Sequence, residues 1–160
     1  MPTTRTSWSS RRSGSRATSR TTRRPTLLAS HEQFVIDTHV LWWYLKDPDR
    51  LSAAATVIFR LAETGNAVLV IPAIAVAEMY FLSVKLGQPL PPSALLDTLV
   101  DISGVELPDM GKEQLEFLER LPEIPEMHDR LIAADAVIRG VPLVTRDAAF
   151  TASPQIETVW

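Results

Sequence analysis

Short apolar runs alternate with longer stretches of helical periodicity from Gln33 to Trp160. The runs are continuously apolar, which is typical of strands that are covered on both faces of a sheet. Strands are predicted at residues 34–36, 67–71, 104–107, 141–145 and 156–160. Helices are predicted at residues 39–46, 53–62, 72–85, 94–102, 112–121 and 129–139. This order predicts an α/β domain with three layers, α/β/α, around a central parallel sheet.

Local signals mark the ends of several helices. Ser52 is a favoured N-cap, and Pro72 suits the first position of a helix. Gly65 and Gly140 each follow a predicted helix, where glycine ends a helix easily because it tolerates a positive φ. Residues 112–121 are amphipathic, with three leucines on one face, and this pattern predicts one continuous helix.

The charge is unevenly distributed along the 160 residues, although the net charge is only −3. Seven arginines and no acidic residue precede Glu32, whereas the rest of the chain has nine basic and 19 acidic residues, a net charge of −10. Residues 1–31 are rich in Ser, Thr and Arg without an apolar period, so we expect a disordered basic arm. Residues 32–160 are expected to form a single folded domain.

Three interpretations of the arm stay open. It can be a disordered tail from a start codon assigned too far upstream, or an arm that binds nucleic acid through its arginines. It can also be a targeting peptide, because an Arg- and Ser-rich composition without acids resembles an organelle transit peptide. No apolar run approaches about 18 residues, so no membrane span is expected. The chain has no cysteine, which excludes disulfides and fits a reducing compartment, and we expect a cytoplasmic protein.

Four carboxylates are predicted to meet at the C-terminal ends of the strands, where parallel sheets form their sites. Asp37 directly follows the first predicted strand, and Asp147 comes just after the fourth. Asp129 begins the helix that precedes the fourth strand. Glu78 lies about two turns into the helix after the second strand, so its side chain can reach back over the strand end.

Glu78 is the hardest of the four to explain as a purely structural residue. Its neighbours three and four positions away are apolar, and none is Lys or Arg: Ile74, Ala75, Phe81 and Leu82. An ionised carboxylate in such surroundings is costly unless it is paired or bound to a metal. The three aspartates have simpler alternatives, because Asp37 and Asp129 can cap the helices that follow them, and Asp147 can pair with Arg146 or begin a turn.

The four acids argue for a cation more strongly together than singly. At about 4 Å and an effective dielectric near 20, each pair of like charges costs on the order of 4 kcal/mol. A cluster of this kind is tolerable only with bound protons or a cation, and ligands that are all oxygen favour Mg²⁺ or Mn²⁺ over zinc. Such ions activate water and stabilise the leaving oxygen in phosphodiester hydrolysis.

The segments FVIDTHVLWW, the helix with Glu78, HDRLIAADA and LVTRDAAF occur in an order that resembles the PIN-domain ribonucleases, and among them the VapC-type toxins of toxin–antitoxin pairs. The resemblance covers about residues 34–160. It implies an α/β/α nuclease fold and endonucleolytic cleavage of RNA that depends on Mg²⁺ or Mn²⁺. The four acidic positions of the family fall on Asp37, Glu78, Asp129 and Asp147.

The resemblance also implies further properties of the site and its partners. Thr145 matches a small hydroxyl residue that precedes the last acid and can orient Asp147 or hold a water. A homodimer is implied, as is inhibition by a cognate antitoxin whose tail covers the acidic pocket. The arginine-rich arm departs from the usual toxin. Asp135 stands where the family often has Gln or Thr, and it is interpreted as an acid that supports the site or contacts a partner, with a surface position as the alternative.

Several residues beside the acids keep two interpretations. His39 and His128 can act as bases, but hydrogen-bonding or surface roles are favoured. Arg130 and Arg146 can meet RNA phosphates or form ordinary ion pairs. Trp42 and its neighbour Trp43 are expected to pack on a helix face or in a dimer contact instead of stacking on bases.

Two other functions compete with the nuclease. The first is a non-catalytic PIN-like module that binds RNA or a protein. The second is a phosphatase or phosphotransferase with an aspartyl nucleophile at Asp37, but the sequence Asp37-Thr38-His39 lacks the second acid of a D-x-D loop. The chain also has no G-x-x-x-x-G-K-[ST] and no G-x-G-x-x-G phosphate loop.

Overall fold

The computed structural model describes residues 32–160, and the predicted basic arm lies outside the described residues. Five parallel strands form one sheet in the order β3-β2-β1-β4-β5. The strands are β1 (Glu32–Ile36), β2 (Ala67–Val70), β3 (Val105–Glu106), β4 (Leu143–Val144) and β5 (Thr158–Val159). The predicted parallel sheet and the three-layer α/β/α architecture are confirmed.

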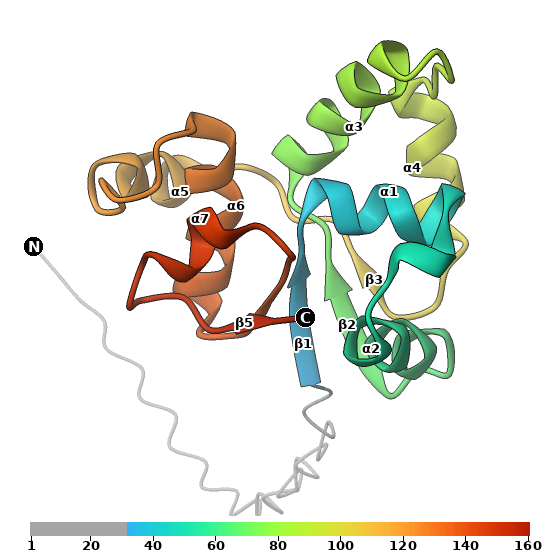
Figure 1. Cartoon of the computed structure of the whole chain (residues 1–160), viewed down its shortest axis with the longest axis horizontal. Helices are drawn as coiled ribbons and strands as arrows, with labels where there is room; N and C mark the ends of the chain where they lie inside the picture. Colours follow the sequence, from blue (N-terminus) through green and yellow to red (C-terminus); the bar gives the residue numbers. More distant parts are fainter. Residues whose placement is uncertain (1–31) are drawn as a thin grey trace, which may run out of the picture.

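The helices cover both faces of the sheet (Figure 1). On one side lie α1 (Thr38–Lys46), α2 (Ala53–Glu63), α3 (Ala73–Lys85) and α4 (Pro92–Val100), with the 3-10 turn η1 (Pro48–Arg50). On the other side lie α5 (Lys112–Glu116), the 3-10 turn η2 (Phe117–Glu119), α6 (Met127–Arg139) and α7 (Ala148–Thr151).

Adjacent strand residues face opposite layers, which explains why the strands are apolar throughout. Phe34 and Ile36 pack into a core under α1 and α2, whereas Val35, between them, packs against α6. In the same way Leu69 and Val70 enter different cores. A strand that is buried on both faces needs an apolar residue at every position. The continuous runs of the sequence therefore identified the sheet correctly.

The segment predicted as one helix at residues 112–121 is divided. The α-helix ends at Glu116 and a 3-10 turn follows. Arg130 Nη1 donates a hydrogen bond to the Leu118 carbonyl at 2.9 Å, so this carbonyl has a partner from outside the segment. Leu115 is 51% exposed whereas Leu121 is fully buried, so only part of the expected apolar face packs into the core. The polar side chain of Gln114 points inward instead.

Other boundaries differ by a few residues, and one helix was missed. The strands β3, β4 and β5 each have only two residues. The helix α6 begins at Met127, so Asp129 lies inside its first turn and is not its N-cap. The missed helix, α7, has four residues.

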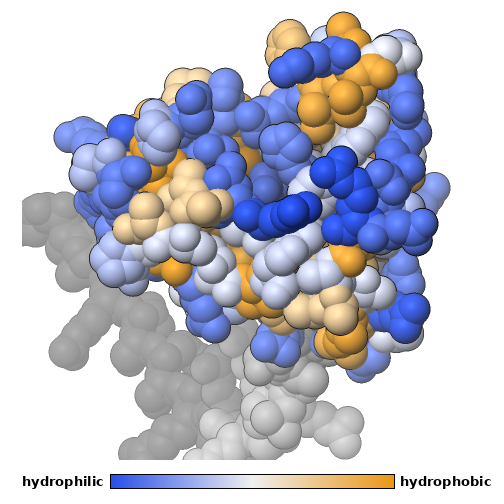
Figure 2. Space-filling view, in the orientation of Figure 1, coloured by the Kyte–Doolittle hydropathy of each residue, from blue (hydrophilic) through white to orange (hydrophobic). Residues whose placement is uncertain are grey.

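A group of exposed apolar side chains lies on α3 and α4, where part of each helix is not covered by the core. Figure 2 shows apolar atoms gathered over the outer end of α3. We call this set the α3–α4 apolar face, and it comprises Tyr80, Phe81, Val84, Leu86, Leu96 and Val100. Phe81 is 71% exposed and Val100 is 72% exposed, which is unusual for large apolar residues.

No helix within residues 32–160 is long and apolar enough to cross a membrane.

Candidate active site

Asp37 lies at the C-terminal end of the central strand β1 and is only 4% exposed. Its Oδ1 accepts a hydrogen bond from the His39 backbone N–H at 3.4 Å, so Asp37 caps α1, which was the simpler alternative for this residue. Its Oδ2 accepts a hydrogen bond from the Thr145 hydroxyl at 2.9 Å. The cap and the site are therefore compatible, because each uses a different oxygen of the same carboxylate.

Thr145 connects two of the predicted acids. Its buried hydroxyl donates to Asp37 and also accepts a hydrogen bond from the Asp147 backbone N–H at 3.0 Å. Asp147 in turn caps α7 through the Ala149 N–H, which donates to Asp147 Oδ1 at 2.8 Å. The hydroxyl thus connects the ends of β1 and β4, whereas the resemblance implied that it orients Asp147 or holds a water.

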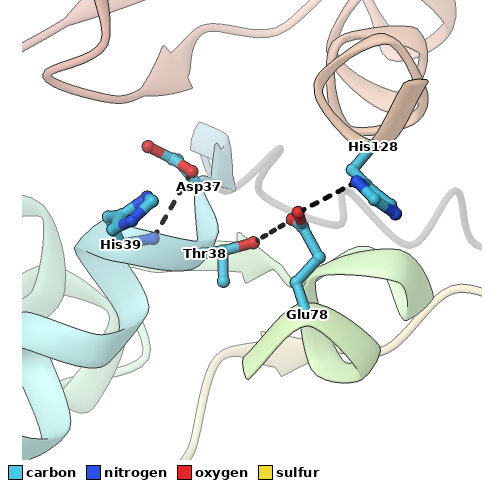
Figure 3. A network of polar contacts seen from close by, with 5 residues as sticks. All are labelled: Asp37, Thr38, His39, Glu78 and His128. Carbon is cyan, nitrogen blue, oxygen red and sulfur yellow. Dashed lines mark hydrogen bonds and ion pairs between the residues drawn. The ribbon is translucent and has the colours of Figure 1, made fainter. Parts of the chain in front are cut away.

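Glu78 reaches toward the end of β1, and both of its oxygens have a partner (Figure 3). The Thr38 hydroxyl donates to Glu78 Oε2 at 2.7 Å, and His128 Nδ1 lies 3.4 Å from Glu78 Oε1. The side chain of Glu78 is 26% exposed. The sequence offered no Lys or Arg partner for Glu78 on its own helix, and its partners come instead from α1 and α6.

Asp129 faces the other three acids from the first turn of α6. Its pKa is raised from 3.8 to about 6, first by burial and then by the negative charges of Asp37, Glu78, Asp147 and, more weakly, Glu126. All three predicted partner acids thus act on one carboxylate. The repulsion indicates that the four side chains share one region of the molecule.

The pKa of Asp37 is also raised, chiefly by burial, with a smaller contribution from the charge of Glu78. Its hydrogen bond from Thr145 and the nearby His39 act in the opposite direction. A carboxylate in this position gains from a neighbouring positive charge, because the charge offsets the cost of removing the anion from water.

The four acids do not stand at the spacing of metal ligands. Within residues 32–160 no group of three or more Asp, Glu or His side chains is close enough to hold a metal ion. Glu78 is engaged by Thr38 and His128, which keeps its carboxylate away from the aspartates. The structure therefore brings the acids to one edge of the sheet without assembling them into a closed ligand set.

Two grooves of opposite character flank the acids. The apolar groove, of about 290 Å³, is lined by Thr38, His39, Glu78, Phe81, Leu82, Lys85 and His128. The basic groove, of about 410 Å³, is lined by Asp37, His39, Trp43, Arg50, Arg146 and Asp147. His39 borders both grooves, so a ligand that occupies either one lies beside the acidic side chains.

Two residues near the acids have structural roles. Arg130 donates to the backbone carbonyls of Ile124, Leu118 and Pro122, so its guanidinium stabilises the loop before α6 and is not available to phosphate. Asp135 is buried and accepts a hydrogen bond from Gln114 Nε2 at 2.9 Å. Burial raises the pKa of Asp135, and none of the four site acids contributes to that shift.

The tryptophans pack as expected. Trp42 and Trp43 are each 7% exposed. The Trp43 ring meets the Trp160 ring edge to face, with 5.4 Å between the ring centroids. The guanidinium carbon of Arg50 lies over the Trp43 ring, 4.6 Å from its centroid. Sequence reasoning missed Arg50 as a neighbour of the site. It also missed the contacts of Thr38 and His128 with Glu78, although their positions directly beside Asp37 and Asp129 in the chain gave a signal.

Comparison with known proteins is consistent with this arrangement. The sequence model of the PIN domain matches residues 34–154. No curated protein matches the sequence of the chain.

Several solved structures share the fold at low sequence identity. VapBC2 from Rickettsia felis, bound to a DNA fragment from its promoter, has a TM-score of 0.62 and 18% identity, and the match covers 79% of this chain and 97% of that one. DNA-bound VapBC from Salmonella typhimurium has a TM-score of 0.59 and 20% identity, covering 80% and 97%. The Sarcin-Ricin loop cleaving toxin VapC20 from Mycobacterium tuberculosis has a TM-score of 0.54 and 16% identity, covering 78% and 97%.

Proposed function

Because the chain belongs to the PIN domain family, we propose that it is an endoribonuclease that hydrolyses RNA phosphodiester bonds with a divalent cation. In this proposal it is the toxin of a type II toxin–antitoxin pair and acts in the cytoplasm. The observation that carries the proposal is the common position of Asp37, Glu78, Asp129 and Asp147, whose charges act together on Asp129. Parallel α/β sheets bind their ligands at the C-terminal ends of the strands, and the four acids lie there.

The residues present fit a hard divalent cation by their chemistry. All four donors are carboxylates, and the pKa of Asp129 is raised to about 6 by burial and by the negative charges of the other three, which supports a need for a cation here. Oxygen donors of this kind suit Mg²⁺ or Mn²⁺. Asp37, Glu78, Asp129 and Asp147 would hold the ion, and Glu78 would have to leave Thr38 and His128 to join the three aspartates. When bound, such an ion lowers the pKa of water and stabilises negative charge on phosphate.

The chain's own residues prepare this site. Thr145 holds Asp37 Oδ2 at 2.9 Å and so fixes the direction of that carboxylate. The Asp147 backbone N–H binds the same hydroxyl, which keeps the two aspartates at a constant separation. Thr38 and His128 hold Glu78 at the border of the apolar groove. Burial of Asp37 restricts water on the inner side of the site.

RNA is the proposed substrate because one structural neighbour, VapC20, is described as a toxin that cleaves the Sarcin-Ricin loop. The test is cleavage of a labelled unpaired RNA by the purified chain. Cleavage is expected with Mg²⁺ or Mn²⁺ and is expected to stop with EDTA. Cleavage that continues unchanged in EDTA would contradict the proposal.

A non-catalytic PIN-like module that binds RNA or protein is the second candidate. The observation that favours it is the lack of any group of three metal-ligating side chains within residues 32–160. The same assay separates the two candidates, because a module of this kind binds the RNA without cutting it at any metal concentration.

The proposed protein partner is an antitoxin, and we assign it to the apolar groove and the adjoining α3–α4 apolar face. Structural neighbours include toxin–antitoxin complexes. The groove lies between exposed Phe81 and the acid Glu78, so an apolar segment in it would cover the approach to the carboxylates. Large exposed apolar patches of this kind mark protein contacts. A homodimer is also part of the proposal, and light scattering of the purified chain tests it.

Phe81→Ala is expected to weaken antitoxin binding about tenfold, because an aromatic side chain in such a patch commonly acts as an anchor. Affinity can be measured by calorimetry with the cognate antitoxin that the proposal requires. Val57→Ala is the matched control, since Val57 is 54% exposed but lies on α2 outside the groove. Equal affinities of the Phe81 variant and the control would remove the antitoxin from this groove.

A further inference from the structure

The folded domain is acidic, so any anionic substrate must meet its few cations locally. Residues 32–160 contain nine Lys and Arg side chains. Several are occupied elsewhere: Arg139 pairs with Glu106 at 2.7 Å and Lys112 pairs with Glu116 at 3.1 Å. Arg130 is bound to backbone carbonyls. The cations that remain for a ligand are therefore limited.

Two of the remaining cations meet beside the acids. Arg50, at the end of η1, and Arg146, just after β4, line the same basic groove as Asp37 and Asp147. Within residues 32–160 neither arginine forms an ion pair with a carboxylate. Residues nearly a hundred positions apart in sequence are thus brought to one groove, where their guanidinium groups make no direct contact with the two aspartates that also line it.

Arg50 is held in place by an aromatic surface. Its guanidinium carbon lies 4.6 Å from the centroid of the Trp43 ring, and Trp43 is itself fixed by an edge-to-face contact with Trp160. A guanidinium over an aromatic ring keeps the N–H donors of its edges available, because the contact uses its face. Arg50 is therefore positioned in advance to bind an anion.

We propose that the basic groove binds the backbone phosphate next to the one that is cleaved, on an unpaired RNA strand. The inference rests on the proposed nuclease function, since it names where the substrate lies. Guanidinium groups suit phosphate because their planar donors match two of its oxygens. A strand in this groove passes directly from Arg50 and Arg146 to the acids, which share the groove with them. The apolar groove on the other side offers a phosphate only Lys85.

The test measures RNA binding apart from cleavage. A labelled uridine oligonucleotide is titrated, over a range of salt concentrations, into full-length protein that carries Asp37→Asn to prevent cutting. Adding Arg50→Ala or Arg146→Ala is expected to weaken binding about fivefold each. Each loss of a phosphate contact is expected to reduce the slope of log affinity against log salt by about 0.7. The arm is present in every variant, so its arginines contribute equally to all of them.

Two further variants separate binding from structural effects. Arg50→Lys keeps the charge, so it is expected to keep the salt slope even where the lost contact with Trp43 lowers the melting temperature. Arg60→Ala removes an exposed arginine on α2 that lines neither groove, and it is expected to bind RNA like its parent.

The inference and the proposed function fail in different ways. If the double variant Arg50→Ala/Arg146→Ala binds RNA with unchanged affinity and salt slope, the inference is overturned, whether or not the wild-type chain cleaves RNA. If that variant instead loses only the antitoxin, the groove is a protein site and the inference is equally overturned. If wild-type protein cuts no RNA but the variants bind RNA more weakly, the groove assignment is supported and the nuclease assignment fails.

Discussion

Asp37→Asn is expected to reduce RNA cleavage by about 10³-fold, because metal-assisted stabilisation of a phosphoryl transition state is worth several kcal/mol. Asp37 is the most buried of the four acids and the one that Thr145 orients. Asparagine has nearly the same volume, but its single carbonyl oxygen can accept only one of the two hydrogen bonds that Asp37 accepts from His39 and Thr145. The substitution therefore removes the charge and leaves the surrounding packing.

Rates with a labelled RNA and Mn²⁺ measure the effect, and a thermal melt verifies the fold. Because burial raises the pKa of Asp37, loss of the charge is not expected to destabilise the metal-free protein. Asp97→Asn is the control, since this exposed acid lies on α4. If folded Asp37→Asn protein cleaves RNA at the rate of the control, Asp37 is not part of the catalytic site.

Asp129→Asn is expected to stabilise the metal-free protein at pH 7.5 by about 1.5 kcal/mol. The pKa of Asp129 is raised from 3.8 to about 6, which corresponds to about 3 kcal/mol at most. Solvent screening of this half-buried group reduces the value by about half. For a domain of this size the gain corresponds to a rise in melting temperature of about 4 °C.

The sign follows from the protons that each state holds. Between pH 3.8 and about 6 the folded state keeps a proton on Asp129 that the unfolded state has lost. Stability of the wild-type protein therefore falls as pH rises through this range. The stability gained by Asp129→Asn is expected to shrink by more than half at pH 4.5. At that pH the wild-type Asp129 is mostly protonated in the folded protein and is therefore neutral, like the asparagine of the variant.

Thermal melts in EDTA at the two pH values measure this prediction. Asp97→Asn again serves as the control, because it removes one negative charge from an exposed helix position. If the melting temperature of Asp129→Asn at pH 7.5 is equal to or below that of the wild type, ionised Asp129 does not destabilise the folded protein and the prediction is wrong.

The sheet could be predicted from the sequence because burial on both faces leaves a direct mark. Phe34, Val35 and Ile36 enter alternate cores, so every position is apolar. The end of that strand then identified Asp37 without any knowledge of the structure. The hydroxyl of Thr145 could be assigned because it lies just before Asp147, although its hydrogen bond goes to Asp37 Oδ2 and not to the Asp147 carboxylate.

The segment around α5 could not be predicted, because its conformation depends on groups from α6. The three leucines at residues 115, 118 and 121 have helical spacing, but Gln114 is the residue that faces inward to Asp135. Arg130 Nη1 binds the Leu118 carbonyl, which a continuing helix could not satisfy because Pro122 has no N–H. These are tertiary contacts between residues that are 12 and 21 positions apart in the sequence, so local periodicity cannot predict them.

The candidate site shows the same division. Its acids could be proposed from the sequence because they follow strands or interrupt an apolar helix. The partners of Glu78 could not, because Thr38 and His128 reach it from two other helices. Arg50 was missed because its place beside Asp147 depends on the fold of η1 against Trp43.

The central claim is that these four carboxylates form one site for a divalent cation. Its most direct test is the melting temperature of wild-type protein and Asp37→Asn during a titration with Mn²⁺ at pH 7.5. At about 100 times the dissociation constant, binding to the folded state alone stabilises by about 2.7 kcal/mol. The wild-type melting temperature is expected to rise by about 8 °C, and that of Asp37→Asn is expected to stay within about 2 °C of its metal-free value. An unchanged wild-type melting temperature, or an equal rise in both proteins, would contradict the claim.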